Sequence, residues 1–180
     1  MPASHQHRVE QLAQAYKEAN ARLMARLAGA SADAAQRGPA AGGWSAAQIG
    51  WHVARVTDTF ADLIAGERPG AAPLPTGFRE REWDAVALEI PEKLEASRSA
   101  TPPPAVTRDD VLAALSGAEA HLLGTLAALT PDRARTLGLT HPLTGTITLY
   151  QVGDWATAHV IRHNRQMKRV LAEHLFEPRG

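Results

Sequence analysis

The sequence predicts an all-α protein, a four-helix bundle with a long crossover between its second and third long helices. Apolar residues recur at steps of three and four over four long stretches, 4–27, 45–67, 107–129 and 149–175. Seven of the twelve prolines fall within 68–106, a density that excludes a long helix there and indicates an extended connection. No stretch shows a convincing strand pattern, so the four helices define the class.

Local signals support the boundaries of these helices. Ser45 followed by Gln48 has the pattern of a capping box, in which each side chain bonds the backbone N–H of the other residue at a helix start. Thr107 can cap the third helix, which carries two aspartates in its first turn. Pro131 prevents that helix from continuing.

The connections between the helices are predicted from composition. Segment 29–43 is rich in Ala, Gly and Ser and should be a loop. Within the crossover we expect only short helical pieces, at 79–87 and 92–97. Segment 137–148 holds Pro142, Gly145 and several threonines and leads into the fourth helix.

Length and composition bound the class of protein. With 180 residues and 44% hydrophobic content, the chain can form a single domain over 1–180 with one core. Lys plus Arg and Asp plus Glu both number 19, so the charge predicts neither nucleic acid nor an anionic membrane as a partner. The absence of cysteine excludes disulfides and thiolate ligands. No signal-like or membrane-spanning apolar run occurs, and we expect a soluble, cytoplasmic protein.

Two histidines near the C-terminus share one face of the last predicted helix. His159 and His163 are four residues apart, and the same stripe carries Trp155 and Val170, so both imidazoles should point into the bundle. Eight histidines over this length would produce such a pair by chance about one time in three, which leaves a solvated or structural pair as the alternative.

His52 has a similar position on the second predicted helix. It lies in an apolar stripe between Ile49 and Val53, where a buried imidazole needs polar partners. Such a histidine can be satisfied by a backbone carbonyl or by a metal. If the helices face each other, His52, His159 and His163 can together hold one divalent transition metal, namely zinc, nickel, iron or manganese; imidazole ligation excludes calcium and magnesium.

The catalytic residues of such a site cannot be named from the sequence. Three neutral imidazoles leave the ion its full charge and at least one open position. Residues 160–162 contain no Glu, so the pattern differs from the zinc-protease H-E-x-x-H motif. Gln48, Trp155 and Gln166 are expected to line the pocket. The alternative for each of these three residues is a purely structural role. Neither glutamine can act as a general base, because an amide does not accept a proton.

Other polar residues near the two helices that carry these histidines are weaker candidates for a role in the site. Asp58 and Asp154 are either exposed or hydrogen bonded to a ligand imidazole. His5, His7 and His174 lie near helix ends and should be solvated. His121 and His141 remain undecided.

The segments GWSAAQIGWH at 43–52 and WATAHVIRHNRQM at 155–167 resemble the DinB/YfiT-like superfamily of metalloenzymes. In that family a Trp-Ser helix start leads to one histidine, and an H-x3-H pair followed by Gln marks the last helix. The short polar segment at 141–146 also looks like the family's hairpin-like approach to that helix. The likeness extends over nearly the whole chain in helix order.

The resemblance implies a four-helix bundle, a mononuclear nickel, zinc or iron-type site, and a homodimer. It leaves the reaction open, because the family includes thiol-dependent S-transferases and isomerases, proposed hydrolases, and stress-induced members. We therefore expect a metal-dependent transferase acting with a low-molecular-weight thiol or another small-molecule substrate. The alternatives are a hydrolase that uses water activated by the metal, and a non-catalytic stress-related metal- or ligand-binding protein.

Overall fold

The computed structural model describes residues 4–91 and 94–173. Within them, the elements in chain order are α1 (His5–Ala28), α2 (Ala32–Gln36), α3 (Ala46–Ala65), β1 (Ala71–Pro73), α4 (Trp83–Ala87), the 3-10 turn η1 (Arg98–Ala100), α5 (Arg108–Ala128), α6 (Pro131–Thr136), β2 (Leu137–His141), β3 (Gly145–Thr148) and α7 (Leu149–Glu173). The fold is mostly helical, as the sequence predicts.

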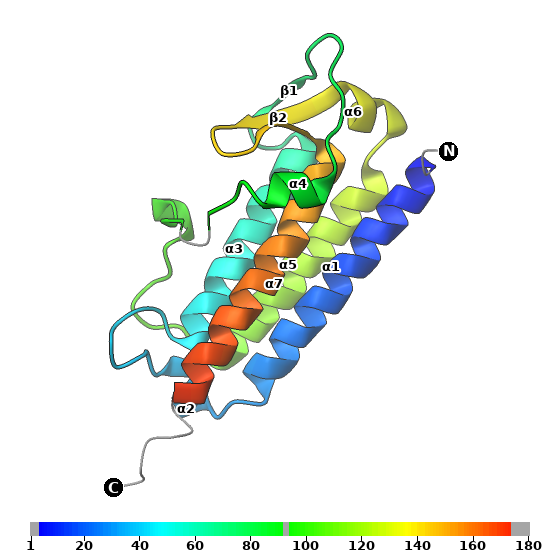
Figure 1. The fold of residues 1–180 in the computed structure, drawn as a ribbon. Coiled ribbons are helices and arrows are strands. Elements are labelled where there is room, and N and C mark those ends of the chain that lie inside the picture. The colour runs from blue at the N-terminus through cyan, green and yellow to red at the C-terminus, as the bar shows by residue number, and fades with distance from the viewer. Residues whose placement is uncertain (1–3, 92–93, 174–180) are drawn as a thin grey trace, which may run out of the picture.

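The four long helices α1, α3, α5 and α7 lie side by side as a bundle (Figure 1). Helix α3 packs against α5 and α7, and α1 packs against the same two helices from the other side. The crossover between α3 and α5 returns along the outside of the bundle to the end where α3 began (Figure 1). Neighbouring helices α3 and α5 therefore run in the same direction, which no short connection could achieve. The predicted four-helix bundle with its long crossover is confirmed.

The core forms where the apolar stripes of the four helices meet. Its largest fully buried side chains include Tyr16 from α1, Ile49 from α3, Leu115 from α5 and Met167 from α7. Helices α3 and α5 approach closely at Gly50, where an added Cβ would lie 2.6 Å from a methyl group of Val111. Only glycine fits this crossing without displacing a neighbour.

A small antiparallel sheet, which the sequence analysis did not predict, covers one end of the bundle (Figure 1). Its order is β1-β2-β3, and β2 and β3 form a hairpin that ends with His141 opposite Gly145. The hairpin agrees with the expected hairpin-like approach to the last helix. The strands have only three to five residues, too few for alternation to stand out, and β1 ends in Pro73.

The helix boundaries differ from the predicted ones by a few residues. Helix α3 ends at Ala65 because Gly66 adopts a left-handed conformation, φ +83°, and terminates it. The expected loop at 29–43 contains the short helix α2. Of the expected piece at 79–87 only α4 forms. Residues 94–97 are not helical, and 92–93 lie outside the described residues, as do 174–175 of the last predicted helix.

Within the described residues, one helix is long and apolar enough to cross a membrane by length and composition, α5. A single such helix is weak evidence, because a core helix of a folded domain passes the same test. Helix α5 lies along α3 and α1 and buries one stripe, made of Val111, Leu115, Ala118, Leu122 and Leu126.

Candidate metal centre

The first histidine of the site lies on α3, two turns beyond the helix start. That start is fixed by the predicted capping box: Ser45 Oγ accepts from the Gln48 N–H at 3.2 Å, and Gln48 Oε1 accepts from the Ser45 N–H at 3.0 Å. The cap sets where the helix begins and hence which residues face inward. His52 is on the inward face and is 5% exposed.

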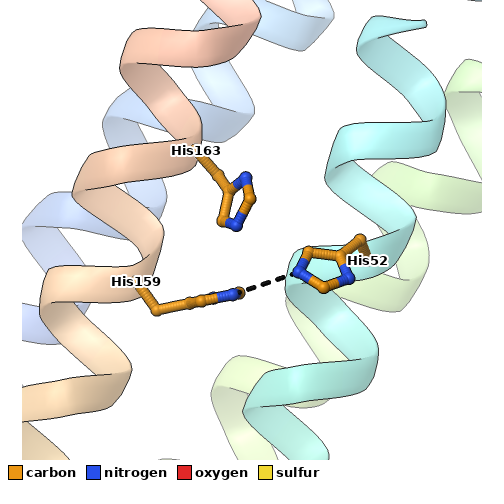
Figure 2. A group of neighbouring side chains, drawn as sticks. All are labelled: His52, His159 and His163. Atoms are coloured by element: carbon orange, nitrogen blue, oxygen red, sulfur yellow. Dashed lines mark hydrogen bonds between the residues drawn. The ribbon is translucent and has the colours of Figure 1, made fainter. Parts of the chain in front are cut away.

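The other two histidines lie one turn apart on α7 and face α3. Figure 2 shows the His159 and His163 rings pointing toward the His52 ring. The Nε2 atoms of His52 and His159 are 3.1 Å apart. One ring nitrogen of each of the three residues lies within 4.8 Å of the others. The structure therefore brings together the three histidines that the sequence analysis selected.

Hydrogen bonds at the far side of two rings fix their tautomers. His52 Nδ1 lies 2.7 Å from the carbonyl oxygen of Ala100, and His163 Nδ1 lies 2.8 Å from Oε1 of Gln166. Both oxygens can only accept, so each Nδ1 carries the proton and each Nε2 presents its lone pair as an acceptor. Within the described residues the buried Nδ1 of His159 has no hydrogen-bond partner.

All three imidazoles are neutral at pH 7. Burial lowers the pKa of His52, and the charge of Arg162 contributes to the same shift. Burial also lowers the pKa of His163 to about 3 and that of His159 well below its ordinary value, reinforced by the neighbouring imidazoles and Arg162. Neutral imidazole is the form that binds a metal ion.

The donor set fits a divalent transition metal. Two Nε2 atoms bound to one tetrahedral ion at about 2.0 to 2.1 Å each would lie about 3.3 Å apart, and His52 and His159 already approach this spacing. Without an ion, a neutral His159 that carries its proton on Nε2 donates across this 3.1 Å contact to the Nε2 lone pair of His52. A set of three nitrogens and no oxygen suits zinc, nickel, iron or manganese, and it does not distinguish among them.

Aromatic rings surround the three imidazoles. Trp44 lies 4.9 Å from His52 between ring centroids, and Phe60 lies 6.3 Å from His159. Trp155 is 9% exposed and packs between Phe60 and His141. His159 as a residue is half-buried, whereas His52 and His163 are buried.

The two glutamines expected to line the pocket have different roles. Gln166 bonds His163 and orients that ring. Gln48 forms no hydrogen bond with the three imidazoles within the described residues. Its Oε1 completes the α3 cap, and its Nε2 donates to the Pro103 and Pro104 carbonyls at 2.9 and 3.3 Å. It fastens the crossover to the start of α3.

Neither aspartate near the ligand helices bonds an imidazole of the site. Asp58 accepts from His121 at 3.2 Å, and Asp154 forms an ion pair with Arg8. Burial raises the pKa of Asp154 to about 6, although Arg8 opposes the shift. Asp62, Glu67 and His121 make a second cluster of metal-ligating types at the surface, where Glu67 is exposed and His121 Nε2 lies 3.7 Å from a carboxylate oxygen of Asp62.

The remaining histidines lie apart from the three. His5 bonds the Tyr150 hydroxyl at 2.6 Å and is half-buried rather than solvated, while His7 is exposed. His174 lies outside the described residues. Surface pockets of about 540 and 370 Å³ border α5, and none of the three site histidines lines either of them.

Two partners of the site were not found from the sequence. A backbone carbonyl such as that of Ala100 has no sequence signal. Arg162 did have one, because it lies inside the H-x3-H motif. Its Nη2 is 3.4 Å from His163 Nε2, and its Nη1 donates to the Pro91 carbonyl at 3.3 Å.

A helical bundle with three convergent imidazoles from its second and last long helices defines a class of helical proteins with a candidate metal site. The chain belongs to the DinB superfamily, whose sequence model matches residues 15–167. No protein of curated function matches it significantly.

Two solved structures are similar to this fold. A conserved protein from Enterococcus faecalis has a TM-score of 0.66 at 16% identity, over 93% of this chain and 97% of that chain. YfiT from Bacillus subtilis, described as a probable metal-dependent hydrolase with an unusual four-helix bundle topology, has a TM-score of 0.52 at 22% identity, over 93% of this chain and 89% of that chain. At these identities the likeness shows the fold.

Proposed function

We propose that the protein is a mononuclear metalloenzyme in which His52, His159 and His163 hold one divalent transition metal, and that it transfers a low-molecular-weight thiol to an electrophilic small molecule. The observation that carries the proposal is the geometry of the ring nitrogens. Two imidazoles have their Nδ1 atoms held by oxygen acceptors, and their Nε2 lone pairs face the third ring.

When bound, the ion would act as a Lewis acid that lowers the pKa of a coordinated thiol or water. The protein supplies position and surroundings. The Ala100 carbonyl and the Gln166 amide hold two rings in place, as hydrogen-bond partners of metal ligands commonly do. Trp44 lies against the His52 ring and Phe60 lies beside the His159 ring, so both restrict the access of water to the site.

The lack of a general base at the site favours a thiol over water as the nucleophile. No carboxylate of the described residues contacts the three imidazoles, since Asp58 and Asp154 are engaged by His121 and Arg8. A thiol has an ordinary pKa of about 8.5 and water one of about 15.7, so a thiol loses its proton with far less help.

Hydrolysis is the second candidate. The similarity to YfiT, which is described as a probable metal-dependent hydrolase, supports it. The same open position would then take water, and the proton would have to leave to solvent rather than to a side chain. A non-catalytic role requires a site that binds neither thiol nor substrate.

The metal site is tested by elemental analysis of protein purified without chelator. We expect about one transition-metal ion per wild-type chain and a large loss in His52→Gln and His159→Gln, with folding verified by circular dichroism. His121→Gln is the matched control, because it removes a histidine from the α3–α5 surface cluster and should keep the metal. Equal metal content in all four proteins would contradict the site.

The reaction class is tested with the cobalt(II)-loaded protein. A thiol that enters the site should produce an intense thiolate-to-cobalt absorption band in the near ultraviolet. If neutral and charged thiols leave the spectrum unchanged while activated esters are cleaved in a histidine-dependent manner, the hydrolase replaces the transferase.

A further inference from the structure

Arg162 is a cation placed at the edge of the three-histidine site. It lies on α7 between His159 and His163, and its guanidinium reaches both His163 Nε2 and the crossover carbonyl of Pro91. The side chain is half-buried. Arg162 is therefore beside the reacting region without belonging to the ligand set.

The guanidinium has no carboxylate partner in the part of the chain that the structure describes. Its two hydrogen bonds, at 3.3 and 3.4 Å, are long and go to neutral acceptors, whereas arginines 8 and 81 each pair with a carboxylate. Partial burial of a cation without an opposite charge is unfavourable, so the position suits an incoming anion.

The contact with His163 also points to a ligand. The Nε2 lone pair of His163 cannot serve the guanidinium and a metal ion at once. In the metal-loaded protein the Nη2 group of Arg162 loses that acceptor and retains donors directed to the space beside the ring. Three neutral imidazoles and one guanidinium also leave the loaded site strongly positive, with no acidic side chain in contact with the rings.

We propose that Arg162 binds a carboxylate of the substrate, so that the site selects small molecules carrying both a metal-binding donor atom and a carboxylate. This inference rests on the proposed function. A carboxylate is favoured over a phosphate because one guanidinium matches one carboxylate in a two-point hydrogen bond, whereas a phosphate dianion usually takes several cationic or backbone donors.

The test uses the cobalt(II)-loaded protein and two thiols that differ only in charge, 3-mercaptopropionate and 3-mercaptopropionamide. Dissociation constants come from titrating the thiolate-to-cobalt band. We expect the carboxylate thiol to bind at least about tenfold more tightly to the wild type, the size of one charge-assisted hydrogen bond. Arg162→Gln should abolish most of that preference, and Arg162→Lys should keep part of it.

The control variant is Arg165→Gln, which removes the same charge from an exposed position on the same helix and should keep the wild-type preference. If Arg162→Gln keeps the full preference, the carboxylate binds the ion itself and the inference is wrong. Equal binding of both thiols to the wild type contradicts the inference alone. A cobalt spectrum that responds to neither thiol contradicts the proposed thiol transfer as well.

Discussion

Acidification should destabilise the metal-free protein through His163. Its pKa is about 3 in the folded protein against an ordinary value of 6.5, so protons bind preferentially to the unfolded chain. The stabilisation is fully present above pH 6.5 and is lost as the pH falls toward 3. At pH 5 the unfolded histidine is protonated and the folded one is not, which lowers the unfolding free energy by about 2 kcal/mol relative to pH 8.

The assay is urea denaturation in the presence of chelator, at pH 8 and pH 5, for the wild type and His163→Gln. Asp154 acts in the opposite direction, because its raised pKa stabilises the fold as the pH falls below about 6. That contribution is common to both proteins and cancels in their difference. The stability of the wild type relative to the variant should therefore fall by about 2 kcal/mol between pH 8 and pH 5. A difference that does not change with pH would refute the reasoning.

Two further changes test the support of the site and of the core. Gln166→Leu removes the acceptor of the His163 Nδ1 proton and should weaken metal binding about 10- to 100-fold. The affinity is measured by competition with a chromophoric chelator. An undiminished affinity would show that this hydrogen bond does not orient the ring. Gly50→Ala should destabilise the fold by about 1 kcal/mol in urea denaturation, because the clash with Val111 outweighs the gain in helix propensity. A variant as stable as the wild type would contradict the close helix crossing.

The long helices and the ligand trio were accessible from the sequence because both depend on periodicity. The 3.6-residue repeat gave the four helices, and it also placed His52, His159 and His163 on inward faces. Ser45 gave the start of α3 within one residue, because a capping box is a local interaction with a fixed spacing.

The missing features depend on interactions between distant segments. The sheet consists of short strands that pair at one end of the bundle. Strand β1 precedes α5 in the chain and β2 follows it, so their pairing joins segments that are distant in sequence. The sequence left two partners open for His52, a backbone carbonyl or a metal; in the structure Nδ1 bonds a backbone carbonyl and Nε2 faces His159. The carbonyl belongs to Ala100, 48 residues away, whose role no residue type could have revealed.

The separation of the three histidines along the chain affects when the proposed metal site can exist. His52 and His159 are 107 residues apart, and the last two ligands lie on the final helix of the described chain. During synthesis the first histidine is available long before its partners have been made. A growing or truncated polypeptide thus lacks the complete set of three histidines, and binding of one ion by all three imidazoles would require that the last helix has packed against the second long helix.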